Sequence, residues 1–135
     1  MAGMTLELKS LTKSYGRTEA VRGISVAFRE GEIAGLLGPN GAGKSTTISM
    51  LAGLLSPSSG DILLDGTSVL GRLPGWRRQV GVVLEEPALF EYLTVQEHLA
   101  LMGRLYGLSA AETGRRAGEL MEFFQLGPFA ATVAR

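Results

Sequence analysis

The residues best suited to chemistry lie together in a glycine-rich segment, Gly-Pro-Asn-Gly-Ala-Gly-Lys-Ser-Thr, at positions 38 to 46. Glycine allows positive φ angles, so backbone N–H groups can approach phosphate oxygens closely. Lys44 supplies a mobile positive charge for the β and γ phosphates, and the Ser45 hydroxyl can ligate Mg²⁺. The pattern predicts a phosphate-binding loop for a nucleoside triphosphate, and we expect that ligand to be ATP. The expected nucleotide contacts are Gly38, Pro39, Asn40, Gly41, Ala42, Gly43, Lys44, Ser45 and Thr46.

The segments on either side of this loop have the context that it requires. Ile33 to Leu37 is a continuous apolar run, as expected of a strand buried on both faces of a parallel sheet. An amphipathic helix is predicted after the loop, with an apolar stripe at Ile48, Leu51, Ala52 and Leu55. The start of that helix would add its positive end and free amides to the anion site. The alternative interpretation is a glycine-rich turn that merely ends a strand.

Further strands and helices are indicated along the rest of the chain. We predict strands over 5–9, 24–28, 61–65 and 80–84, with a loop over 71–75. Two later helices each begin with a capping box, Thr94-x-x-Glu97 and Ser109-x-x-Glu112. The expected apolar face of the first helix is Val95, Leu99, Met102 and Tyr106. The expected face of the second is Ala117, Leu120, Met121 and Phe124. Gly107 is placed to end the first helix.

Composition excludes several classes of protein. The 135 residues are 45% hydrophobic and carry 13 basic and 13 acidic side chains, so no net charge favours nucleic acid. The absence of cysteine excludes a disulfide framework and thiol chemistry. No apolar stretch approaches the roughly 18 residues that span a bilayer, and the amino terminus lacks the pattern of a signal peptide. We expect no direct membrane insertion, so any link to a membrane must involve a partner.

Beyond the loop, the chain resembles the nucleotide-binding domain of ABC transporters. The similar segments are residues 11–16 with 20–25, the loop itself, 58–66, and 80–94, and the resemblance covers residues 5 to 130. It implies an α/β fold, a P-loop NTPase core with an amino-terminal antiparallel β subdomain and the start of a helical subdomain. The implied divisions are 5–31, 32–87 and 88–135. Tyr15 occupies the position of the family's aromatic residue that stacks on adenine.

The resemblance also implies a Mg²⁺ ion bound with ATP. Glu85 stands where the family normally carries a glutamine, so Ser45 and Glu85 are the expected metal ligands, and Lys44 and Glu85 the expected catalytic residues. A carboxylate can hold a hard cation or orient a water molecule. The alternative for Glu85 is a solvated acid at the end of a strand.

Several later motifs of the family are absent from these 135 residues: the signature motif, the Walker B strand with its acidic residues, and the switch histidine. The chain therefore resembles the front half of a domain. Asp65 follows an apolar run but fits a surface hairpin better than a Walker B position. We expect this incomplete domain to bind ATP without turnover, to expose the apolar segment 33–37, and to be marginally stable.

The complete protein is expected to hydrolyse ATP as a dimer with a second nucleotide-binding domain. Its partner would be a transmembrane permease subunit, which places it on the cytoplasmic face of the membrane. Residues 88–93 either receive the permease's coupling helix or pack at a helix start. The segments around Glu85 and 93–98 resemble export relatives more than import relatives. A soluble ABC-type ATPase and a small-molecule kinase are the alternative functions.

Two conspicuous residues have structural interpretations: His98 as a surface or packing residue, and Trp76 as part of a short surface helix rather than a nucleic-acid contact.

Overall fold

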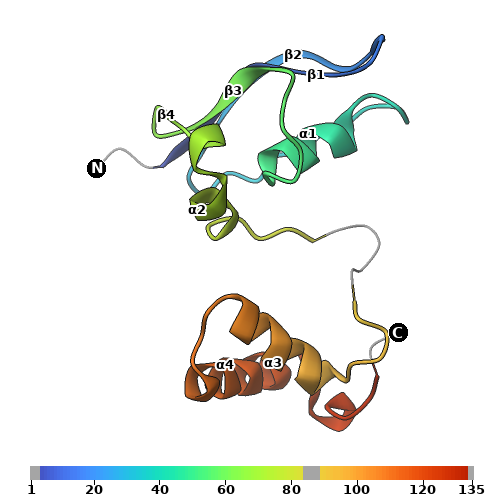
Figure 1. The fold of residues 1–135 in the computed structure, drawn as a ribbon, viewed down its shortest axis with the longest axis vertical. Coiled ribbons are helices and arrows are strands. Elements are labelled where there is room, and N and C mark those ends of the chain that lie inside the picture. Colours follow the sequence, from blue (N-terminus) through green and yellow to red (C-terminus); the bar gives the residue numbers. More distant parts are fainter. Residues whose placement is uncertain (1–3, 84–88, 134–135) are drawn as a thin grey trace. The chain divides into compact units, whose positions relative to one another are not determined.

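The computed structural model describes residues 4–83 and 89–133 (Figure 1). The chain divides into two compact units, Met1–Val82 and Val83–Arg135. The first contains an antiparallel sheet and two helices, and the second a pair of helices. Glu85, the predicted metal ligand, lies outside the described residues.

A four-stranded antiparallel sheet forms the first unit, in the order β2-β1-β3-β4 (Figure 1). The strands are β1 (Thr5–Tyr15), β2 (Thr18–Arg29), β3 (Ser59–Leu64) and β4 (Thr67–Ser68). Asp65 and Gly66 join β3 to β4, and both have the positive φ angles, 49° and 76°, that a two-residue hairpin turn favours. The interpretation of Asp65 as a hairpin residue is therefore confirmed.

An irregularity in β1 keeps its leucines on the buried face. Leu8 and Leu11 are both buried although they are three positions apart, which simple alternation would not allow. The register with β2 shifts between these two residues, and Ser10 between them has a φ of 46°. The extra residue of this β-bulge places the Leu11 side chain on the same buried face of the sheet as Leu8. Gly60 lies against the same bulge and belongs to β3, the strand that pairs with the other edge of β1.

Two helices accompany the sheet, α1 (Lys44–Leu51) and α2 (Leu73–Arg77), the latter after a 3-10 turn at Leu70–Arg72. The predicted loop over 71–75 is therefore wrong. Pro74 favours the first turn of a helix, and the buried side chain of Trp76 anchors that helix. The indole Nε1 of Trp76 donates to the Leu51 carbonyl at 2.7 Å. Trp76 lies in a short helix as predicted, but its side chain is buried. The core side chains are Leu8, Leu11, Val21, Met50, Ile62, Val69 and Trp76.

The buried face of α1 differs from the predicted stripe. Thr47 and Met50 are the buried residues of this helix, whereas Ile48 is 48% exposed. The other three predicted positions are confirmed, because Ala52 is buried and Leu51 and Leu55 pack against the core. The prediction was wrong for Ile48 because it followed the apolar residues alone. The inward position is taken instead by Thr47, which an apolar pattern does not include.

The predicted strand over residues 33–37 is not formed. Ile33 and Leu37 are essentially fully exposed, and residues 33–40 have no regular structure. The same is true of residues 80–83, where Val83 is also exposed, while Leu84 lies outside the described residues. A parallel strand requires a neighbour to pair its amides and carbonyls, and the described residues provide none for these segments. The predicted exposure of this apolar edge is confirmed.

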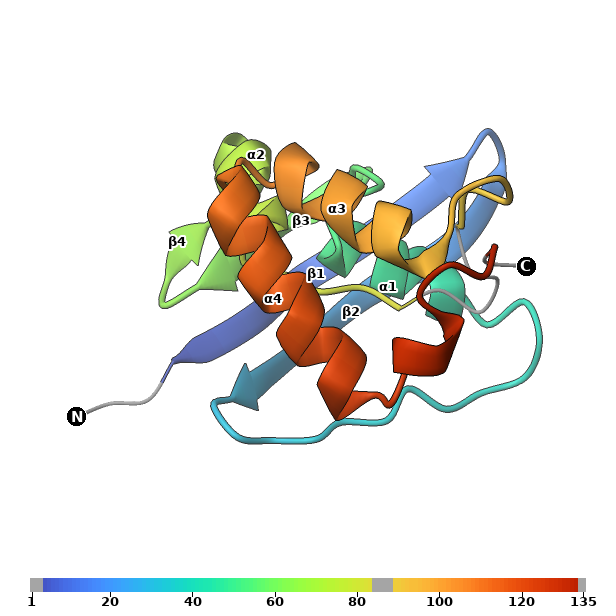
Figure 2. The same ribbon diagram turned by 90° about the horizontal axis from the view of Figure 1, so that it is seen from below.

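The second unit is built from α3 (Val95–Leu105) and α4 (Ala110–Phe123), which lie side by side (Figure 2), followed by a 3-10 turn at Gly127–Phe129. The capping box at Thr94 and Glu97 is confirmed. Ser109 accepts from the Glu112 amide at 3.2 Å, but the Glu112 carboxylate pairs with arginines, so only half of the second box forms. Gly107 follows α3 with a φ of 78°, as predicted.

The predicted apolar faces of α3 and α4 are only partly buried. The fully buried residues of the two helices are His98 and Thr113, and the aromatic and leucine side chains Tyr106, Leu120 and Phe124 are exposed. A pair of short helices has too little surface of its own to cover all its apolar side chains.

Replacing Gly103 with alanine should destabilise this helix pair. A Cβ at Gly103 would lie 2.5 Å from Cγ2 and 2.6 Å from Oγ1 of Thr113, which is buried and stiff at χ1. We expect a loss of about 1–3 kcal/mol in the free energy of unfolding, measured by urea titration. Gly118→Ala on α4 is the control, because no atom lies within 4 Å of its added Cβ. It should stabilise the helix by about 1 kcal/mol, and equal effects of the two changes would contradict the packing argument.

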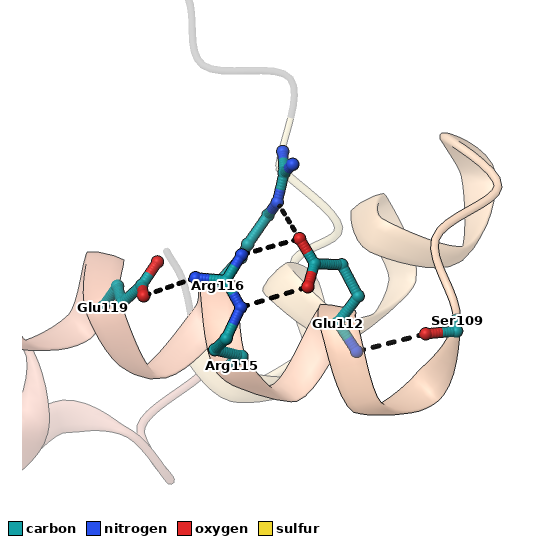
Figure 3. A network of polar contacts seen from close by, with 5 residues as sticks. All are labelled: Ser109, Glu112, Arg115, Arg116 and Glu119. Carbon is teal, nitrogen blue, oxygen red and sulfur yellow. Dashed lines mark hydrogen bonds and ion pairs between the residues drawn. The ribbon is translucent and has the colours of Figure 1, made fainter.

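An ion-pair network on α4 gives a pH-dependent contribution to stability (Figure 3). The Nε and Nη2 of Arg115 and the Nε of Arg116 donate to Glu112 at 2.7–3.0 Å, and the Nη1 of Arg115 donates to Glu119 at 2.6 Å. Arg115, followed by Arg116, lowers the pKa of Glu112 from 4.5 to about 2. A carboxyl whose pKa is lower in the folded state stabilises that state above its unfolded pKa and loses this effect as the pH falls.

The melting temperature should therefore be higher in the parent chain than in Glu112→Gln at neutral pH. The difference should shrink as the pH is lowered from 4.5 to about 2. A difference that stays constant over this window would show that the charge of Glu112 does not contribute.

Candidate nucleotide-binding site

The glycine-rich loop runs directly into α1. Gly41 and Gly43 have φ angles of 82° and 84°, in the left-handed region that glycine favours, as the sequence predicted. The first amide bonded within the helix is that of Thr47, which donates to the Gly43 carbonyl at 2.8 Å. The amides of residues 44–46 precede it and have no intrahelical acceptor. Three adjacent N–H donors are thus available at the positive end of α1.

The side chain of Lys44 folds back across the loop. Its Nζ donates to the carbonyl of Gly38 at 2.7 Å and to the carbonyl of Pro39 at 2.8 Å. An ammonium group has three donors, so these two bonds leave one for a further acceptor. The lysine charge is therefore held at the loop, where an anionic oxygen would complete its hydrogen bonding.

Two contacts of Gly43 were not predicted from the sequence, one within the start of α1 and one with the sheet. Thr47 is buried, and its hydroxyl donates to the Gly43 carbonyl at 2.9 Å. A Cβ at Gly43 would lie 2.2 Å from the carbonyl oxygen of Ala20 in β2, so the loop backbone lies almost directly on that strand. The glycine spacing gave no information about which strand would support the loop.

Tyr15 lies near this support. It is the last residue of β1 and pairs with Thr18, the first residue of β2, two positions before Ala20. The end of this hairpin and the residue that precedes α1 therefore both lie next to the first residues of β2. The Tyr15 side chain is 52% exposed, which leaves ring surface available to a flat ligand. Its contact with adenine stays a prediction.

Ser45 is a predicted Mg²⁺ ligand that lies within the described residues. Ser45 is exposed at the first turn of α1, where its hydroxyl could ligate Mg²⁺. Among the described residues, no three His, Cys, Asp or Glu side chains gather as a metal site. Mg²⁺ commonly takes only one or two protein ligands and obtains the rest from phosphates and water. The loop amides, Lys44 and Ser45 therefore fit a triphosphate that carries its own cation.

The segment before α3 is the second candidate surface, predicted to receive a permease helix. Leu89, Phe90 and Tyr92 are exposed by 49%, 52% and 92%. His98 is buried beneath them: its Nε2 accepts from the Phe90 amide at 2.8 Å, and its ring lies 5.5 Å from that of Phe90. His98 is thus a packing residue, one of the two roles predicted for it. The segment's role in docking stays a prediction.

A glycine-rich loop that opens a helix and holds its own lysine defines a P-loop nucleotide-binding domain. The chain belongs to the ABC transporter family, whose model matches residues 21–135. The structure and its relatives show an incomplete ATP-binding domain with an antiparallel sheet and the start of the helical region.

The relatives are ATP-binding proteins of this family. The linearmycin resistance ATP-binding protein LnrL of Bacillus subtilis is 42% identical over 90% of this chain and 39% of its own length. The Nod factor export ATP-binding protein I of Cupriavidus pinatubonensis is 42% identical over 90% of this chain and 37% of its own. The chain thus spans about two fifths of these curated relatives.

A solved structure shows the same fold. The dimeric ATP-binding cassette MJ0796, bound to ADP and phosphate, matches 95% of this chain and 61% of its own with a TM-score of 0.80 and 28% identity. In the part of the chain that the structure describes, no helix is long and apolar enough to cross a membrane.

Proposed function

We propose that this chain is the nucleotide-binding part of an ABC transporter subunit that couples ATP binding and hydrolysis to transport, with export the favoured direction. The observation that carries the proposal is the position of Lys44, whose Nζ is held by the carbonyls of Gly38 and Pro39 in the loop that opens α1. Export is supported by the similarity to the Nod factor export protein and to the linearmycin resistance protein.

Each part of the loop has a distinct task in this proposal. The amides of residues 44–46 and the one remaining Lys44 donor bind the β and γ phosphates, and the Ser45 hydroxyl ligates the accompanying Mg²⁺. Tyr15 stacks on the adenine. Glu85 completes the metal site or orients the attacking water. P-loop hydrolysis also requires the acidic residues of a Walker B strand, which these 135 residues do not include. The 135-residue chain therefore binds ATP without steady-state turnover.

The proposed partners are a transmembrane permease and a second nucleotide-binding domain. Dimerisation is supported by MJ0796, which is dimeric in its post-hydrolysis state. The exposed side chains of Leu89, Phe90 and Tyr92 support permease docking, because an aromatic apolar patch of this kind is typical of interaction surfaces. The subunit would then act at the cytoplasmic face of the membrane.

The proposal is tested by reversing the charge of Lys44. Lys44→Glu should weaken ATP binding roughly a hundredfold, because it removes a charge-assisted hydrogen bond and adds repulsion. Affinity is measured by calorimetric titration. Lys9→Glu, at an exposed side chain that pairs with nearby Glu7, is the matched charge reversal and should leave the affinity unchanged. Unchanged affinity in Lys44→Glu would reject the site.

A further inference from the structure

The ring of Tyr15 is covered on one face by the side chain of Lys13. The Lys13 Nζ lies 5.4 Å from the centroid of the ring. An ammonium group at this distance over an aromatic face is attracted by the ring's quadrupole. Lys13 and Tyr15 are two positions apart on β1, so their side chains leave the same face of the strand. The remaining exposure of Tyr15, 52%, leaves part of the ring open to solvent.

Lys13 is itself held from the other side. Its Nζ donates to the carbonyl of Ser56 at 2.7 Å, in the turn that follows α1. That turn is fastened to β1 by bonds on both sides of Lys13. The Ser58 amide donates to the Thr12 carbonyl at 2.9 Å, and the Ser14 amide donates to the Ser58 hydroxyl at 3.0 Å. The position of the ammonium group is thus set by backbone that is tied to the sheet.

This arrangement restricts an exposed aromatic ring that would otherwise be free to change rotamer. Ordering a side chain before binding lowers the entropy lost when the ligand arrives. A cation on one face also leaves the opposite face as the place for a flat partner. Lys13 therefore prepares Tyr15 to stack on a planar ring next to the loop that receives the phosphates.

We propose that Lys13 is a positioning residue for the nucleotide base, which acts by holding the Tyr15 ring through a cation–π contact anchored at the Ser56 carbonyl. The inference rests on the proposed function, in which residues 38–46 bind the triphosphate. It adds a determinant of affinity for the base that is independent of the phosphate contacts. Lys13 acts through Tyr15 in this proposal, because its Nζ is placed by the Ser56 carbonyl and the Tyr15 ring.

The test compares a ligand that has a base with one that has none. Affinities for ATP and for inorganic tripolyphosphate are measured by calorimetric titration. The proteins compared are the full parent chain and its Lys13→Met and Lys13→Arg variants. Methionine keeps the length of the side chain without its charge, and arginine keeps the cation. Lys13→Met should weaken ATP binding about two- to fivefold, the effect of one exposed cation–π contact, and leave tripolyphosphate binding unchanged. Lys13→Arg should restore the affinity for ATP.

The Tyr15→Ala background separates this mechanism from simple charge attraction. With the ring absent, Lys13→Met should cause no further loss of ATP affinity. An equal loss for both ligands, a loss that persists without the ring, or no loss at all would overturn the role of Lys13. Unchanged tripolyphosphate affinity also shows that the variant has folded around an intact loop. If the parent chain binds neither ligand, the proposed function fails together with this inference; if it binds tripolyphosphate alone, only the base-positioning role fails.

Discussion

Replacing Gly43 with alanine should abolish nucleotide binding and destabilise the first unit. The added Cβ would lie 2.2 Å from the Ala20 carbonyl oxygen and 3.1 Å from Cγ2 of Val21, which is buried. Neither neighbour can yield easily, because Ala20 contributes strand backbone and Val21 belongs to the core. The φ of 84° adds strain for any residue with a Cβ. The loop must therefore move away from β2, and its amides lose their alignment toward the phosphates.

The size of this effect can be checked against Gly41→Ala. Gly41 has a similar φ of 82°, but a Cβ there would meet no atom within 4 Å. The Gly41 variant should lose about 1 kcal/mol in the free energy of unfolding, and the Gly43 variant about 2–4 kcal/mol. Urea titration gives both values, and calorimetry with ATP gives the affinities. Equal destabilisation would mean that backbone strain, rather than the contact with β2, explains the glycine.

Gly60→Ala should produce the largest loss of stability without touching the loop. Its Cβ would lie 2.4 Å from the carbonyl oxygen of Ser10, 2.5 Å from that of Lys9 and 2.7 Å from the Cα of Leu11. All three are backbone atoms of the β-bulge in β1, so no side chain can rotate to make room. We expect a loss of about 3 kcal/mol or more in the free energy of unfolding, from the clash and from a φ of 84°.

Gly66→Ala is the control for this second change. Gly66 has a φ of 76° in the β3–β4 turn and open space around it, so it should lose only about 1 kcal/mol. The comparison is made by thermal or urea unfolding followed by circular dichroism. If the two variants unfold at the same denaturant concentration, the close approach of β3 to the bulge does not constrain the sheet.

Local signals in the sequence predicted the parts of the site that depend on local geometry. The spacing from Gly38 to Thr46 predicted the loop and the helix that follows it, because the chemistry of phosphate binding requires those residue types in that order. The capping box at Thr94 and Glu97 and the terminal Gly107 were predicted because the ends of a helix favour those residue types at that spacing. Each of these features involves residues only a few positions apart.

Features that depend on distant contacts could not be predicted in this way. An apolar run such as 33–37 predicts a strand, but a strand forms only where a neighbour pairs with it. Only the bulge at Ser10, which lies 50 positions away in the sequence, explains why residue 60 must be glycine. Lys13 could have been noticed from its two-residue spacing to Tyr15, but the Ser56 carbonyl that holds it lies far along the chain.

The burial of Trp76 has a practical consequence. Its indole donates a hydrogen bond to Leu51, the last residue of α1, and Arg77 donates to Gly53 just beyond. Trp76 is the single tryptophan of the sequence. The tryptophan fluorescence of the protein therefore originates at the carboxyl end of the helix whose amino end opens the glycine loop. A change in the surroundings of that helix end when nucleotide is added can be followed by this emission, without any attached dye.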